Sequence, residues 1–370
     1  DDEFAINRKN IFFITAMSNV SWEEDMKNKI PECFKNNVYH HGKLQRLRER
    51  LCNVRNALII NDEIDSGDKE GQKLHILLKE SGVLDMTYME EKNIRFVFVS
   101  ATIINELKAL YKWGEKHTIY YMTVPDTYIG HEEFLELGNL KEYYDVKNSE
   151  TAYRWIQEDI IDNYGSDFRI HFIRTDKTRH HFVFNACIRH GIEFKNHTSD
   201  DRISRAELNE IFTSITNHMV IAVKGFYRRA NLIPNVWKKK IGATHEKYVK
   251  KYDTNVAVQA FPGRLSGFWK DDIMNGHKTG PHRTSIAAVQ EYIAFYKNPL
   301  SHDVHYQTAS KKVFLKRENI TNFEDEDEVE EILPSYRIYS DEITVNQVCT
   351  MLKYRYRSTK LNSEGFRETS

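Results

Sequence analysis

A run of four apolar residues at 57–60 and one asparagine are followed directly by Asp62 and Glu63, and Asp65 comes two residues later. Four consecutive apolar residues are typical of a strand buried on both faces, as in the interior of a parallel sheet. Open α/β sheets bind ligands at the carboxyl ends of their strands. Carboxylates at such an edge can hold Mg²⁺ through its waters, and a neighbouring carboxylate can orient and deprotonate an attacking water. The alternative is a strand followed by a solvated acidic turn.

The elements that would position these carboxylates alternate between strands and helices. Apolar runs predict strands at residues 11–15, 38–39, 57–60, 95–99 and 118–122. Helices are expected at 22–29, 43–53, 72–79 and 104–112, and leucines at 44, 47 and 51 share one helical face. Strands that alternate with helices at this spacing predict a doubly wound parallel sheet.

A second α/β series follows an irregular stretch that contains proline and glycine. Its predicted strands are 168–173, 192–195, 219–223 and 256–258, and its predicted helices are 178–189, 204–215 and 285–296. Residues 324–331 hold seven acids in eight positions, which is typical of a solvated linker. The sequence therefore predicts a first domain at 1–124, a linker at 125–150, a second domain at 151–297, and an acidic linker with a C-terminal extension at 298–370.

Composition excludes several classes of protein. Lys and Arg total 53 against 54 for Asp and Glu, so any nucleic-acid site must be a local patch on a balanced surface. The four cysteines form no C-x-x-C pair, and the 16 histidines show no H-E-x-x-H spacing, so the sequence indicates no zinc site. No G-x-S-x-G motif, membrane-length apolar run or signal peptide is present. An intracellular protein, cytoplasmic or nuclear, is expected.

The order of the motifs that follow these strands resembles the motif order of the superfamily-two helicases and translocases. NDEID at 61–65 matches their Walker B (DExD/H) motif, VFVSAT at 97–102 their SAT motif, and VAVQAFPGRLSG at 256–267 their arginine-finger motif. IFFITAMSN at 11–19 and IAVKGFYRRANLIP at 221–234 are similar to motifs that face nucleic acid, and FRIHFIRT at 168–175 to the opening strand of the second domain. The resemblance implies two RecA-like doubly wound α/β domains in tandem. The sequence also has the character of helicases from large DNA viruses and phages.

The resemblance also implies a role for each motif residue in the hydrolysis of Mg-ATP. Asp62 would hold the metal, and Glu63 would activate the attacking water. Arg264 would stabilise charge on the γ-phosphate as an arginine finger, and Gln259 would contact the same phosphate or its water. Further nucleotide contacts fall on Asp65, Ser100, Thr102 and Gly263. The alternatives are a surface salt bridge for the arginine and helix capping for the two hydroxyl side chains.

Nucleic acid is the partner that the resemblance implies, with DNA favoured over RNA. Helicases of this type bind chiefly the phosphate backbone, which hydroxyl, amide and basic side chains contact. The candidates are Thr15, Ser18, Asn19, Lys224, Arg228 and Arg229. The alternative for the two adjacent arginines is an ordinary basic turn.

The chain departs from the helicase pattern at three places. No stretch matches the phosphate-binding Walker A loop G-x-x-x-x-G-K-[ST], which should precede residue 11. The spacing from Gln259 to Arg264 is one residue longer than usual, and Gly267 stands where many relatives carry another arginine. We therefore expect either a fragment of a nucleic-acid-dependent ATPase whose phosphate loop lies upstream, or a degenerate, inactive helicase-like module that serves as a nucleic-acid- or protein-binding scaffold.

Overall fold

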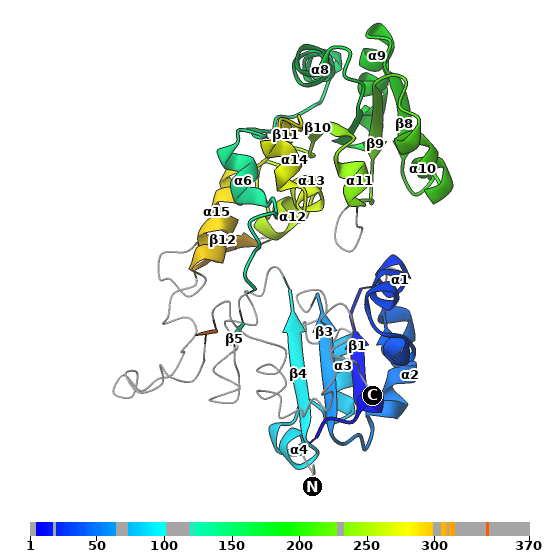
Figure 1. The fold of residues 1–370 in the computed structure, drawn as a ribbon, viewed down its shortest axis with the longest axis vertical. Coiled ribbons are helices and arrows are strands. Elements are labelled where there is room, and N and C mark those ends of the chain that lie inside the picture. Colours follow the sequence, from blue (N-terminus) through cyan, green and yellow to red (C-terminus); the bar gives the residue numbers. More distant parts are fainter. Residues whose placement is uncertain are drawn as a thin grey trace. The chain divides into compact units, whose positions relative to one another are not determined.

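The computed structural model describes residues 5–17, 20–63, 73–100, 119–120, 122–227 and 233–298, together with short strands at 305–308, 311–314 and 338–339. The chain divides into two compact units, each built on a parallel sheet (Figure 1). The first unit comprises Asp1–Thr123 and Ile320–Ser370, and the second comprises Val124–Asn319. The predicted fold class, two α/β domains with parallel sheets in tandem, is confirmed.

The first unit contains a four-stranded parallel sheet in the order β2-β1-β3-β4. The strands are β1 (Ile11–Ile14), β2 (Val38–Tyr39), β3 (Ala57–Asp62) and β4 (Ile94–Val99). The described helices are α1 (Val20–Lys29), α2 (Leu44–Leu51), α3 (Lys73–Glu80) and α4 (Met86–Glu91). The predicted elements are therefore confirmed within the described residues, and α4 is an addition. The helix predicted at 104–112 lies outside the described residues.

Helix α2 shows how leucine spacing anchors a helix to this sheet. Leu44, Leu47 and Leu51 are buried, as the spacing predicts, in one apolar cluster with the leucines of α3. On the polar face, Arg50 donates hydrogen bonds to Tyr39 Oη at 2.6 Å and to Asn37 Oδ1 at 2.7 Å. The helix is thus held to the region around β2 by an apolar face and by one arginine.

A short pairing joins the C-terminal extension to the first unit. Strand β5 (Ile119–Tyr120) pairs in parallel with β14 (Ile338–Tyr339). Most of the predicted extension at 298–370, including the acidic run, lies outside the described residues. No helix within the described ranges is long and apolar enough to cross a membrane.

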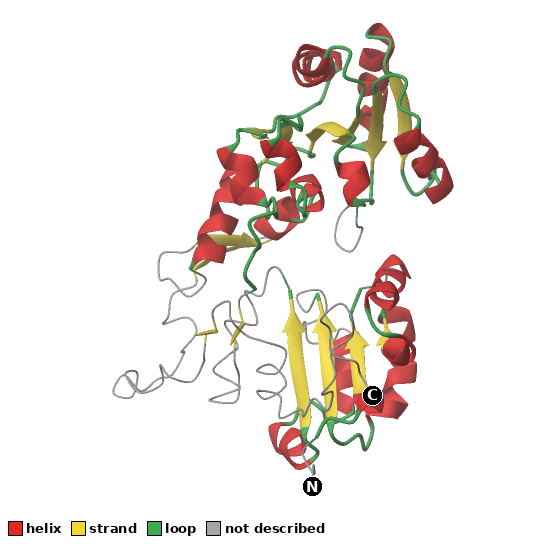
Figure 2. Cartoon of the chain, in the orientation of Figure 1, coloured by secondary structure: helices red, strands yellow, loops and turns green. Residues whose placement is uncertain are grey.

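The second unit contains a six-stranded parallel sheet in the order β6-β11-β10-β7-β9-β8. The strands are β6 (Leu140–Glu142), β7 (Ile170–Arg174), β8 (Glu193–His197), β9 (Met219–Val223), β10 (Ile241–His245) and β11 (His282–Thr284). Helices alternate with them (Figure 2): α6 (His131–Glu136), α7 (Ser149–Trp155), a π-helical segment (Ile156–Ile161), α8 (Asp162–Tyr164), α9 (His180–Arg189), α10 (Arg205–Thr213), α11 (Asn235–Lys238), α12 (Thr254–Val258), α13 (Phe261–Leu265), α14 (Lys270–Met274) and α15 (Ile286–Lys297). Strands β12 (His305–Thr308) and β13 (Lys311–Phe314) form a separate antiparallel pair.

The six-stranded sheet is buried on both faces. Along β9, Val220 and Ala222 pack into one apolar cluster, whereas Met219, Ile221 and Val223 pack into another. Because side chains alternate between the faces of a strand, this division places one core on each side of the sheet. A continuous apolar run such as 219–223 is what a strand in this position requires.

Two sequence-based predictions for the second unit are wrong. The stretch 125–150, predicted to be an irregular linker, contains α6 and the edge strand β6 and belongs to the second unit. Phe134 of α6 is fully buried in the core of that unit, so this stretch packs as part of the domain.

The second error concerns residues 256–258, predicted to be a strand, which form the end of helix α12. Asp253 precedes this helix and accepts a hydrogen bond from the Val256 backbone N–H at 3.1 Å. Such an N-cap satisfies a helix terminus and outweighs the strand propensity of two valines.

Candidate active site

Asp62 is the last residue of β3 and lies at the carboxyl edge of the first sheet. Its Oδ2 accepts a hydrogen bond from the indole Nε1–H of Trp22 at 2.7 Å. Its Oδ1 accepts the backbone N–H of Glu63 at 3.1 Å. Trp22 belongs to α1, the helix that follows β1, and is itself buried. Two donors therefore orient this half-buried carboxylate, and the sequence alone did not indicate the tryptophan.

Glu63 adopts a backbone conformation that is uncommon for a residue with a side chain. Its φ is +54°, in the left-handed region. Non-glycine residues in this region cost free energy, and they cluster at functional sites where the surrounding structure holds them. The chain therefore turns sharply at Glu63, immediately after the last residue of the strand. This turn places Glu63 next to Asp62 at the sheet edge.

Ser100 lies on the neighbouring strand end. Asp62 is paired with Val99 in the register of β3 and β4, so Ser100 directly follows the residue beside the carboxylate. The structure thus brings Asp62, Glu63 and Ser100 to one edge of one sheet. Thr102 and Asp65 lie outside the described residues.

The predicted nucleic-acid contacts lie partly within the described residues. Thr15 follows β1; its side chain is fully buried, and its Oγ1 accepts the Met17 N–H at 3.3 Å. Lys224 follows β9 and is exposed, while its backbone N–H donates to His197 O at 3.1 Å. The predicted contacts outside the described residues are Ser18, Asn19, Arg228 and Arg229. The roles of all these residues remain predictions.

In the second unit, the predicted finger motif forms the turn between α12 and α13. Gln259 lies in the turn and is buried, and Arg264 is half-buried in the last turn of α13. A Cβ atom at Gly263 would lie only 2.0 Å from Val258 O, so no larger residue fits without moving the backbone. The glycine thus allows α13 to pack directly against the end of α12. This close packing is a structural reason for a glycine directly before Arg264.

A buried ion pair missed by sequence analysis lies next to the finger motif. Arg174, the last residue of β7, donates from Nε to Glu246 Oε2 at 2.8 Å, and both side chains are almost completely buried. Glu246 directly follows β10, and its Oε1 accepts the Phe261 backbone N–H at 2.8 Å. Neither residue stands in a motif with a recognisable spacing, so only the tertiary structure shows that they meet.

The surroundings of Arg264 disfavour additional positive charge. Burial lowers the pKa of His131 to about 4, and the charge of Arg264 acts in the same direction, against the hydrogen bond to Val258 O. Burial, together with Arg264, also lowers the pKa of Lys238 to about 8. Both depressed pKa values result chiefly from burial, and the nearby charge of Arg264 adds to the effect. Arg264 therefore lies close enough to His131 and Lys238 for its charge to act on both side chains.

The side chain of Lys238 also lies close to Gly267. Its Nζ donates to Ser266 O at 2.5 Å, and a Cβ atom at Gly267 would lie 2.7 Å from that nitrogen. The place where many helicases carry a second arginine is therefore next to a lysine from α11 in this chain.

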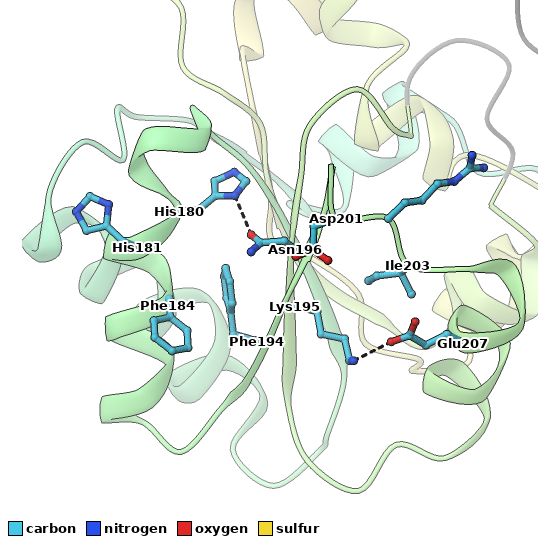
Figure 3. A pocket seen from close by; sticks show the side chains of 10 residues that line it. His180, His181, Phe184, Phe194, Lys195, Asn196, Asp201, Ile203 and Glu207 are labelled. Carbon is cyan, nitrogen blue, oxygen red and sulfur yellow. Dashed lines mark hydrogen bonds and ion pairs between the residues drawn. The ribbon is translucent and has the colours of Figure 1, made fainter. Parts of the chain in front are cut away.

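A hollow of about 550 Å³ in the second unit lies away from these residues, at the open edge of β8 (Figure 3). Phe184 of α9 and Phe194 of β8 line one side of it, and the pair formed by Lys195 and Glu207 lies on the other. It contains none of the predicted site residues. Among the described residues, no group of three or more histidine, cysteine or acidic side chains could hold a metal ion.

Comparison with known proteins found no matching family model and no matching curated protein. Solved structures of S. cerevisiae Dbp5 align with the chain. A Dbp5 variant bound to a Gle1 variant and IP6 aligns over 89% of this chain and 81% of that chain, with 13% identity and a TM-score of 0.40. A Dbp5 variant and Dbp5 itself, each bound to RNA and ADP BeF3, align over 79% of this chain and 76% of theirs, with 12% identity and TM-scores of 0.42 and 0.38.

Proposed function

We propose that the protein is a nucleic-acid-dependent ATPase of the superfamily-two helicase type. The observation that carries the proposal is the carboxyl edge of the first sheet. There Asp62 is oriented by two hydrogen bonds, Glu63 follows in a strained turn, and Ser100 follows the adjacent strand. These residues stand in the order and at the strand ends that the helicase motifs require.

The residues present fit magnesium and a nucleotide. Each oxygen of Asp62 accepts one hydrogen bond, which leaves lone pairs on both oxygens for magnesium-bound waters. When bound, Mg-ATP would supply the metal and the phosphoryl group for transfer to water. Asp62 would hold the metal through its waters, and the hydrogen bond from the Trp22 indole would help to orient the carboxylate.

The remaining roles follow from the chemistry of phosphoryl transfer. Glu63 would accept a proton from the attacking water at a carboxylate oxygen. Arg264 would supply positive charge to the phosphate oxygens, and Gln259 would help to orient the water. The exposed Lys224 would contribute to binding of the phosphate backbone of nucleic acid.

A second candidate function is a helicase-like module that binds nucleic acid without hydrolysing ATP. The observation in its favour is that no segment of the sequence matches G-x-x-x-x-G-K-[ST]. Backbone N–H groups and the lysine of that loop normally hold the β- and γ-phosphates.

One experiment separates the two candidates. ATP hydrolysis by the full-length protein would be measured alone, with single-stranded DNA and with single-stranded RNA, alongside nucleic-acid binding. We expect turnover that rises with nucleic acid and falls at least about a hundredfold in Glu63→Gln. Glu49→Gln, an exposed acid on α2, is the control and should keep full turnover. Nucleic-acid binding without turnover would favour the scaffold, and unchanged turnover in Glu63→Gln would refute the proposed mechanism.

A further inference from the structure

The N-terminus of the finger helix α13 is capped by a side chain from another part of the fold. Phe261 is the first residue of this helix, and its backbone N–H donates to Glu246 Oε1 at 2.8 Å. No side chain at the residue preceding the helix provides a cap. A carboxylate at this position satisfies an N–H that has no partner within the helix, and its charge complements the helix dipole.

The carboxylate that caps α13 is itself fixed by Arg174. The other oxygen, Glu246 Oε2, accepts the Arg174 Nε–H at 2.8 Å. Arg174 Nη2 donates in turn to two backbone carbonyls of the segment after β9, Phe226 O at 3.0 Å and Tyr227 O at 3.2 Å. The guanidinium also lies 5.0 Å from the centre of the Phe261 ring. Each oxygen of Glu246 therefore has a separate partner.

The pair lies at the carboxyl edge of the second sheet, where it joins separate segments. Arg174 ends β7, and Glu246 follows β10, which is paired directly with β7. The side chains can meet because these strands are adjacent in the sheet although their residues are 72 positions apart. Glu246 is thus anchored at the edge of the sheet, and its carboxylate contacts the first residue of α13.

Arg264 is tied to the same helix by its backbone. Its N–H donates to Ala260 O at 3.0 Å, across the helical turn that begins at Phe261. Movement of the helix N-terminus would therefore move Arg264. A guanidinium that must meet developing charge on a phosphate is sensitive to such shifts, because a displacement of about 1 Å can cost about a hundredfold in rate.

We infer that Glu246 is a positioning residue for Arg264: its carboxylate caps α13 and holds the finger in place, and Arg174 holds the carboxylate. This inference rests on the proposed function, because it assigns Arg264 its role in ATP hydrolysis. Glu246 acts through the helix and does not itself touch the nucleotide.

The test compares two variants that differ only in the cap. Both carry Arg174→Gln, so that the buried pair becomes neutral and no lone charge remains. The second substitution is Glu246→Gln in one variant, which keeps an oxygen acceptor for the Phe261 N–H, and Glu246→Met in the other, which has a similar shape but no such acceptor. Thermal unfolding verifies that both are folded, and Glu193→Met, an exposed acid on β8, is the control.

We expect the methionine variant to lose about tenfold in kcat relative to the glutamine variant, with little change in the KM for ATP. Hydrogen exchange of the Phe261 amide should be faster in the methionine variant only. Arg264→Ala, measured in parallel, should lose about a thousandfold in kcat.

The outcomes separate this inference from the proposed function. If Arg264→Ala is impaired but the two double variants have equal kcat, Glu246 does not position the finger and the inference is overturned. If Arg264→Ala keeps full turnover, or the unmodified protein has none, the proposed finger role fails and the inference falls with it. A matched loss of kcat and of amide protection in the methionine variant alone supports the inference.

Discussion

Acid should destabilise the second unit because several of its histidines, of which His245 and His282 have the clearest surroundings, are buried as neutral groups. His245 and His282 are at most 1% exposed, and burial lowers the pKa of each to about 3. His245 also has Arg283 and Arg154 nearby, whose charges act in the same direction against its hydrogen bond to Glu246 O. His282 lies between the hydroxyls of Thr244 and Thr279, at 3.1 and 3.2 Å.

The direction of the effect follows from proton binding. An exposed histidine in the unfolded chain has a pKa of about 6.5, whereas these two bind protons in the folded state only near pH 3. Between these values the unfolded state binds more protons, so stability is lost as pH falls below about 6.5. At about 1.4 kcal/mol per pH unit, each histidine removes roughly 2 kcal/mol from the free energy of unfolding by pH 5.

The two histidines together therefore remove about 4 kcal/mol by pH 5, a large share of the 5–15 kcal/mol typical of a folded domain. The assay is urea unfolding at pH 7.5 and pH 5.0, followed by tryptophan fluorescence. Three of the chain's five tryptophans, Trp155, Trp237 and Trp269, report on the second unit.

The discriminating variant is His282→Gln, which keeps a polar group between the two threonines but does not titrate. The difference in unfolding free energy between the two pH values should shrink by about 2 kcal/mol in this variant. His181→Gln, at an exposed position, should leave the difference unchanged. An identical pH difference in His282→Gln and in the unmodified protein would refute the argument from burial.

Three further substitutions test separate parts of the structure. Leu47→Ala should lower the free energy of unfolding of the first unit by about 2–5 kcal/mol in urea titrations, because the side chain is fully buried; a loss below about 1 kcal/mol would contradict the packing described. Gly263→Ala should lower kcat strongly, because its Cβ would meet Val258 O at 2.0 Å, and wild-type turnover would show that the turn can move. Trp22→Phe should raise the Mg²⁺ concentration needed for half-maximal hydrolysis, because Asp62 loses a hydrogen bond at 2.7 Å; an unaltered magnesium titration would count against the role of the indole.

The sequence by itself determined where the central strands lie and what ends them. Continuous apolar runs predict β1, β3, β4 and β9. Of these, β1, β3 and β9 lie inside parallel sheets, where a strand must be apolar on both faces. The leucine spacing predicts α2 for a similarly local reason. Since Asp62 and Glu63 adjoin such a run, their place at the edge of the first sheet could also be predicted.

Strands with polar sequences could not be found in this way. Strand β10, with the sequence IGATH, and strand β11, with HRT, are buried although they carry histidine, threonine and arginine. Several of their polar atoms are satisfied by partners distant in sequence, as when Arg283 donates to the buried Asp159 carboxylate at 2.8 Å. No local pattern predicts such partners, because burial of a polar side chain depends on what the rest of the chain brings to it.

The same reason applies to the finger motif. The sequence shows Gln259, Gly263 and Arg264 in order, but their positions depend on the preceding helix α12, which Asp253 caps, and on the close approach of Gly263 to Val258 O. The supporting pair of Arg174 and Glu246 exists only because β7 and β10 are neighbours in the sheet. Local sequence determined which groups stand at the strand ends, and the order of the strands decided which of them meet.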